Sequence, residues 1–67
     1  MVITTQSLMA ACGQIKTFGS FGEKYQVLKP LCQLDSGDWL MRVKILGTGE
    51  NIDYRYTEIL CDPLVNP

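Results

Sequence analysis

Residues 39–56 read WLMRVKILGTGENIDYRY, and the alternation in this stretch decides the fold. Apolar side chains occupy the odd positions from 39 to 45, whereas Arg42 and Lys44 stand at even positions between them. Such alternation is typical of a strand with one buried face. The turn-forming sequence GTGE follows, and the alternation then resumes. The stretch therefore predicts a hairpin of two strands, 39–46 and 51–56.

A third strand is expected at residues 25–34, because the turn cluster DSGD separates it from the hairpin. Folding both hairpins about their turns pairs apolar residues on one side of the sheet: Leu34 with Trp39, Cys32 with Met41, Pro30 with Val43, Leu28 with Ile45, Ile45 with Ile52, Val43 with Tyr54 and Met41 with Tyr56. A slip of one residue would turn Arg42 and Lys44 into the core. Pro30 lacks an amide hydrogen, which suits an edge strand. We therefore predict a three-stranded antiparallel meander with residues 25–34 at its edge.

The segment before these strands has the spacing of a helix. Leu8, Cys12 and Ile15 lie four and three residues apart, which places them on one helical face and predicts a short helix over residues 5–12. Gly13 suits the left-handed conformation that ends many helices.

The segment after the strands ends at Pro63. Thr57 is a candidate cap for one helical turn or a short tail, which Ile59 and Leu60 would pack against the sheet. Residues 64–67 are expected to fray.

The predicted fold is thus a single α+β domain over residues 1–67: a short N-terminal helix with a three-stranded antiparallel β-meander. A small barrel-like β fold is the alternative, because Val27, Leu31, Leu40 and Leu46 make the second face of the sheet partly apolar.

Composition removes several classes of function. The 67 residues include three cysteines and no histidine, so a Ser–His or Cys–His nucleophile pair is impossible and no closed disulfide framework forms. A zinc site would need all three widely spaced thiolates and a carboxylate. The acids stand mostly in turns, where they normally solvate the chain. We therefore expect no enzyme activity, cofactor or metal, and reduced cysteines that are partly buried.

The N-terminal residues carry no signal for export. No Lys or Arg precedes the first apolar residues, polar side chains interrupt them, and no stretch approaches the roughly 20 apolar residues of a membrane span. We expect a cytoplasmic protein without membrane contact.

The second face of the predicted sheet collects positive charge on a chain whose formal net charge is -1. It holds Lys29, Leu31, Leu40, Arg42, Lys44 and Arg55, with Asp53 among them. The predicted register sets Lys29 opposite Lys44 and Arg42 opposite Arg55. This face is either a solvated surface that discourages aggregation or a docking surface.

The leucines on that face favour a protein partner, because interfaces mix apolar and Arg side chains. They could equally join two copies as a homodimer. Nucleic acid is less favoured as a partner, because no aromatic side chains lie among the basic residues of this face to stack on nucleobases.

The sequence FGSFG at residues 18–22 reads as a loop that contains two aromatic residues. Either it presents Phe18 and Phe21 to a partner, or it is a connector whose two rings cover the core. The sequence thus predicts a non-enzymatic protein–protein interaction or regulatory module, with a nucleic-acid accessory protein as the alternative.

A set of turn and core residues resembles a family of short bacterial proteins of unknown function. The set comprises Phe21-Gly22-x-x-Tyr25-x-Val27-Leu28-x-Pro30, Gly37-Asp38-Trp39, Thr48-Gly49-Glu50, Tyr54 and Ile59-Leu60-x-Asp62-Pro63. The resemblance implies a bacterial cytosolic source and brings no activity, cofactor or site.

Overall fold

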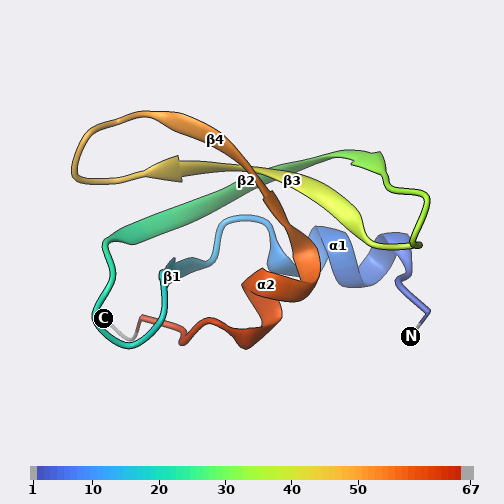
Figure 1. Cartoon of the computed structure of the whole chain (residues 1–67), viewed down its shortest axis with the longest axis horizontal. Coiled ribbons are helices and arrows are strands. Elements are labelled where there is room, and N and C mark those ends of the chain that lie inside the picture. Colours follow the sequence, from blue (N-terminus) through green and yellow to red (C-terminus); the bar gives the residue numbers. More distant parts are fainter. Residues whose placement is uncertain (1, 66–67) are drawn as a thin grey trace.

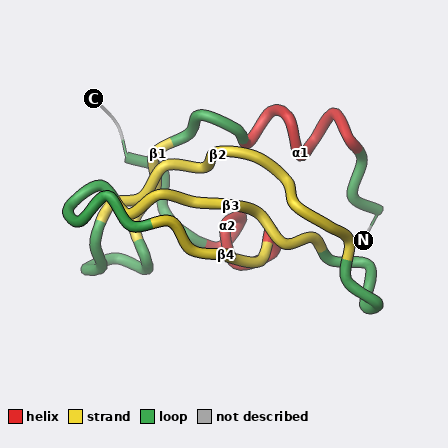
Figure 2. Tube along the Cα trace, turned by 90° about the horizontal axis from the view of Figure 1, so that it is seen from above, coloured by secondary structure: helices red, strands yellow, loops and turns green. Residues whose placement is uncertain are grey.

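The helices and strands follow one another as α1 (Thr5–Ala11), β1 (Ile15–Thr17), β2 (Lys24–Gln33), β3 (Trp39–Ile45), β4 (Asn51–Arg55) and α2 (Tyr56–Cys61) in the computed structural model, which describes residues 2–65. All neighbouring strands are antiparallel, in the order β1-β2-β3-β4. Figure 1 shows both helices on the same side of the sheet, with α1 beside β2 and α2 beneath β3 and β4. Figure 2 looks onto the other side of the sheet, which no helix of the described residues covers.

The predicted α+β class is confirmed, but the sheet has four strands, not three. The additional strand β1 pairs with Lys24–Gln26, so residues 25–34 form an edge only beyond Val27, whose amide still donates to the carbonyl of Gln14 (2.9 Å). The sequence pattern does not predict β1, because this strand is three residues long and has a lysine at its centre. The barrel alternative is wrong, because β1 and β4 are opposite edges of an open sheet.

The predicted register between β2 and β3 is wrong. The observed pairs are Tyr25 with Ile45, Gln26 with Lys44, Val27 with Val43, Lys29 with Arg42, Pro30 with Met41, Cys32 with Leu40 and Gln33 with Trp39. Register shifts lie between Val27 and Lys29 and between Pro30 and Cys32. Each bulge inserts one residue and so reverses which side chains face the core. As a result Tyr25 and Val27 are fully buried, whereas Leu28 is exposed.

The register between β3 and β4 differs from the prediction by two residues. A shift of two keeps each side chain on the side of the sheet predicted for it. Met41 faces Tyr54 and Val43 faces Ile52. The turn lies one residue earlier than predicted, because the amide of Ile45 donates to the carbonyl of Glu50 (2.8 Å) and Gly49 takes a φ of 75°. Tyr56, expected at the end of the strand, instead begins α2.

Both helices pack on the face that carries the core. The buried residues are Leu8, Ala11, Tyr25, Val27, Met41, Val43, Tyr56 and Ile59. The helix predicted over residues 5–12 is confirmed to within a residue, and Gly13 takes the expected left-handed conformation, with φ 90°. The Thr4 hydroxyl accepts a hydrogen bond from the amide of Ser7 (3.1 Å) and caps α1.

Helix α2 is capped from outside its own segment, so the expectation that Thr57 is its cap is wrong. The Asp38 carboxylate accepts hydrogen bonds from the Thr57 hydroxyl (2.6 Å), the Thr57 amide (3.3 Å) and the Trp39 amide (2.8 Å). Burial raises the pKa of Asp38, but these bonds and the charge of Arg55 outweigh it and hold the pKa below its ordinary value. Asp38 thereby joins the β2–β3 turn to the start of α2.

The C-terminal segment returns to β1. Lys16 is 7% exposed, and its ammonium donates to the carbonyl of Ile59 (2.6 Å) near the end of α2. Of the tail expected over residues 64–67, Leu64 bridges to Lys16 and the amide of Val65 donates to Ile15 (2.8 Å), whereas residues 66–67 lie outside the described part.

Candidate functional site

The helix-free side of the sheet, called here the open face, is defined by the strand register. Met41 and Val43 are buried beneath the sheet, so their neighbours on β3, Leu40, Arg42 and Lys44, belong to the opposite side. The cross-strand partners of these three are Cys32, Lys29 and Gln26 on β2 and Arg55, Asp53 and Asn51 on β4. Lys24 joins them, because its neighbour Tyr25 is buried with Lys16 on the helix side.

Most basic residues of the protein lie on the open face, and most acidic residues lie elsewhere. It carries five of the six basic residues, Lys24, Lys29, Arg42, Lys44 and Arg55, while the sixth, Lys16, is buried. One of the seven acids, Asp53, shares it, so the face has a formal charge of +4 (five minus one) on a chain of -1. The remaining acids lie in turns, in α2 or next to it. The predicted basic face therefore exists and includes one cation more than predicted.

The pairing within the open face differs from the prediction. Arg42 faces Asp53, and its Nε lies 3.1 Å from the Asp53 carboxylate in an ion pair whose side chains are 35% and 50% exposed. Arg55 faces Leu40, and Lys29 faces Arg42. One of the two predicted like-charge pairs is thus replaced by an ion pair, whose contribution at this exposure is small.

Of the two leucines expected on this face, one has a cross-strand partner there and the other does not. Leu40 is half-buried opposite Cys32 within the open face, whereas Leu31 lies at the second bulge and has no register partner on β3. Lys24 was missed because the predicted strand began at Tyr25, and because the predicted register put even-numbered residues of this strand on the core side. The observed register differs by one residue at the turn, where Gln33 faces Trp39, and by one more at each bulge.

The cysteines only partly follow the expectation. Cys32 and Cys61 are exposed, which corrects the prediction that all three are partly buried, and Cys12 alone is half-buried. Residues 2–65 contain no group of three His, Cys, Asp or Glu side chains arranged to hold a metal ion. Among the same residues no helix has both the length and the apolar character needed to cross a membrane.

The two aromatic residues of the Phe18–Gly22 loop have opposite environments: Phe18 covers the core, as expected of a connector, whereas Phe21 does not. Phe18 stacks on Tyr25 with ring centroids 4.4 Å apart and meets the edge of Tyr54 at 5.2 Å. Phe21 is fully exposed. The loop is tight, because a Cβ at Gly22 would clash with the backbone carbonyl oxygen of Phe18.

Asp62 fixes this loop to the core. Its carboxylate accepts hydrogen bonds from Tyr25 (2.6 Å), Tyr54 (3.1 Å) and the Gly19 amide (3.1 Å). Burial, followed by the hydrogen bond and charge of Asp62, raises the pKa of Tyr54 to about 12 and raises the pKa of Tyr25 further. No pattern in the sequence pointed to this cluster, since its members lie up to 43 residues apart.

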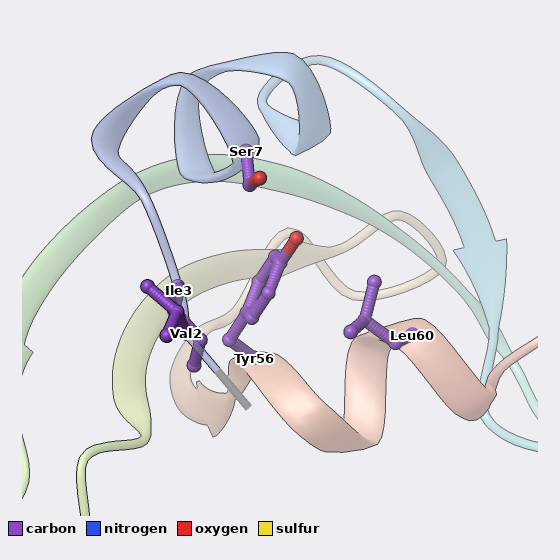
Figure 3. A pocket seen from close by; sticks show the side chains of 5 residues that line it. All are labelled: Val2, Ile3, Ser7, Tyr56 and Leu60. Atoms are coloured by element: carbon purple, nitrogen blue, oxygen red, sulfur yellow. The ribbon is translucent and has the colours of Figure 1, made fainter.

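A hollow of about 230 Å³ opens on the helix side, between the N-terminal segment and α2. Its lining is mainly apolar and comprises Val2, Ile3, Ser7, Tyr56 and Leu60. Figure 3 shows the Tyr56 ring standing between the two segments, with its hydroxyl directed towards α1. The hollow and the open face are on different sides of the sheet.

Comparison with known proteins identifies the relatives of this chain. Residues 2–66 match the model of a family described as "Family of unknown function (DUF5397)". The chain belongs to this family. An uncharacterized protein of Haemophilus influenzae is 41% identical over 51 residues, which cover 76% of this chain and 81% of the relative.

The resemblance found in the sequence is thereby confirmed, and the structure shows what its residues do here. In this member of the DUF5397 family, Asp38 caps α2, Asp62 holds the two tyrosines and Gly22 allows the tight loop. The motif residues that form these contacts maintain the fold. The open face is built mostly from other positions.

Proposed function

We propose that this protein is a non-enzymatic, cytoplasmic docking module whose open face binds an acidic surface of another protein. The observation that supports this proposal is the segregation of charge, which gathers five cations against one carboxylate on the side that no helix within residues 2–65 covers. A surface of one sign attracts a partner of the opposite sign and orients it during encounter.

The composition of the open face favours a protein over a nucleic acid. Leu40 lies among the cations, and interfaces between proteins combine apolar contacts with arginine. Tyr25 and Tyr54, which could stack on bases, belong to the core side of the sheet. Asp53, on the edge strand β4 opposite Arg42, adds a negative charge to the face, which would repel phosphates.

A docking role also agrees with the chemistry of the side chains. The chain has no histidine. Among the described residues, the titratable groups with shifted pKa values are Asp38, Tyr25 and Tyr54, and their hydrogen bonds hold the fold together. Their hydrogen bonds are directed at Thr57, Trp39 and Asp62 rather than into a cleft. The proposal therefore assigns recognition, and no reaction, to this protein.

The test is an NMR titration of the labelled protein with two probes, a synthetic peptide rich in Glu and Leu and a DNA duplex of mixed sequence. We expect the peptide to shift the amide signals of open-face residues and to bind more tightly than the duplex at physiological salt. The double variant Arg42→Gln/Lys44→Gln should lose at least about tenfold in peptide affinity, because two of the cations are removed.

The matched control is Ser20→Glu/Ser36→Glu, which lowers the net charge by the same two units (2 × 1) at exposed turn positions. It should bind the peptide nearly as the wild type does. Absence of open-face shifts with the peptide overturns the proposal. Tighter binding of the duplex, with a steep decline as salt rises, would replace it with the nucleic-acid role.

A further inference from the structure

The N-terminal part of the chain forms a surface of a different character from the open face. Residues 2–15 contain no Asp, Glu, Lys or Arg, and the outward side chains of α1 are exposed and uncharged. Two large apolar side chains there, Val2 and Met9, are 88% and 58% exposed. Depletion of charge together with exposed apolar area is the compositional mark of an interface core.

The hollow extends this surface onto α2. Val2, Ile3 and Ser7 form one wall, and Tyr56 and Leu60 form the other, so the space lies between segments that are far apart in the sequence (Figure 3). Leu60 is 45% exposed at this position. Glu58, the acid in the first turn of α2, lies about 160° round the helix from Leu60, so it is on the other side of α2 from the hollow. Its charge helps to raise the pKa of Tyr54. The exposed side chains of residues 2–10 and this hollow are called here the N-terminal surface.

We propose that a second copy of this chain covers the N-terminal surface in a two-fold symmetric dimer. A two-fold contact brings each patch against the same patch of the partner. A two-fold contact through the open face would oppose a charge of +4 with another +4, which disfavours the homodimer through the leucines of that face. A two-fold contact through the N-terminal surface brings no charged side chain of the described residues against a like charge. The distribution of charge thus selects the surface on which two copies can meet.

The dimer contact would add stability to a chain of this size. A domain of 67 residues buries a modest share of its apolar surface on its own, so covering Val2, Met9 and Leu60 adds burial that one copy cannot supply. The dimer leaves both open faces outward, since they lie on the far side of each sheet (Figure 2). Two outward basic faces would raise the avidity for an acidic partner. The dimer itself does not depend on the proposed docking function.

The experiment is sedimentation velocity of the purified protein over about a hundredfold range of concentration, at low and high salt. We expect a reversible monomer–dimer equilibrium that high salt leaves intact, because uncharged contacts are not screened. Ala10→Glu and Leu60→Glu each place two like charges across the contact and should weaken association at least about tenfold. Ser20→Glu, which adds the same charge in the exposed Phe18–Gly22 loop, should leave association unchanged.

Circular dichroism of each variant confirms that α1, α2 and the sheet are retained, so that lost association reports the surface and not unfolding. A monomer at every concentration overturns the dimer. So does a dimer that dissociates in high salt or in Arg42→Gln/Lys44→Gln while tolerating Ala10→Glu and Leu60→Glu, because such a contact runs through charged groups.

Discussion

The two sides of the sheet treat polar side chains in opposite ways. On the helix side, Asp62 accepts from two tyrosines and a backbone amide, and the Lys16 ammonium donates to Ile59. The Trp39 indole N–H is the exception, since no described residue accepts from it. On the open face, the basic side chains form one ion pair with residues of the described range 2–65, between Arg42 and Asp53. Polar groups on one side hold the fold, while those on the other make few contacts within residues 2–65, so stability and the proposed binding should respond to different substitutions.

The sharpest contrast is between neighbours on β3 that face opposite ways. Met41 is fully buried, so Met41→Ala removes core contacts and leaves a cavity, and we expect a loss of about 2–5 kcal/mol in the free energy of unfolding. Lys44→Ala removes an exposed side chain and should change this free energy by less than about 0.5 kcal/mol. Urea unfolding followed by circular dichroism measures both. Similar losses for the two variants would contradict the assignment of the faces.

The next largest effect concerns Asp62, the polar centre of the helix side. Asp62→Ala leaves the hydroxyl of the fully buried Tyr25 without its acceptor and should cost about 1–3 kcal/mol. Tyr54→Phe removes one donor and keeps the carboxylate, so its cost should be smaller. Unfolding of both single variants and of the double variant gives their coupling free energy, and additive losses would show that Asp62 and Tyr54 do not interact.

An alkaline titration tests the same cluster by a different measurement. The pKa of Tyr54 is raised to about 12, above its ordinary value near 10, so the folded state favours the neutral ring. The associated stability is present below about pH 10 and is lost as the pH rises through 12. Ultraviolet absorbance of tyrosinate should show this late ionisation in the wild type, and an earlier one in Asp62→Ala. An unchanged titration in the variant would count against the hydrogen bond and charge of Asp62 as causes.

A smaller effect is expected at Asp38, at the end of the sheet. Asp38→Ala removes the cap of α2 and should cost about 0.5–2 kcal/mol. Because the folded pKa of Asp38 lies below its ordinary value of about 4, its stabilising effect is present above that pH and is lost as the pH falls. The wild type should therefore lose more stability than Asp38→Ala between neutral pH and pH 3, as thermal unfolding at each pH would show. Parallel losses would mean that the carboxylate charge is not what caps the helix.

The sequence predicted β3 better than β2 for a physical reason. β3 alternates without interruption, so Met41 and Val43 were placed correctly in the core and Arg42 and Lys44 on the other face. In β2 two bulges reverse the alternation, and no local residue pattern marks their positions. Lys29 was still assigned to the correct face, whereas the buried Tyr25 was not.

The polar contacts of the fold were beyond prediction because they join distant segments. Asp38 and Thr57 are 19 residues apart, and Tyr25 and Asp62 are 37 apart. Turn propensity explains why an Asp stands at each position but does not identify its partner. The basic character of the candidate site was predictable, since it depends on which residues share a face. Its pairing was not, because the ion pair of Arg42 depends on a two-residue shift in the β3–β4 register.

The double variant designed to weaken binding at the open face should have only a small effect on stability. Arg42→Gln/Lys44→Gln removes two partly or fully exposed cations and one weak ion pair, so the free energy of unfolding should change by no more than about 0.5–1 kcal/mol. Relief of repulsion between Lys29 and Arg42, which face each other across β2 and β3, offsets part of the lost pair. Urea unfolding at low and high salt checks this, and the difference from the wild type should shrink as salt screens the charges. A loss of several kcal/mol would mean that the open face supports the fold, and that its charges are retained for stability instead of for a partner.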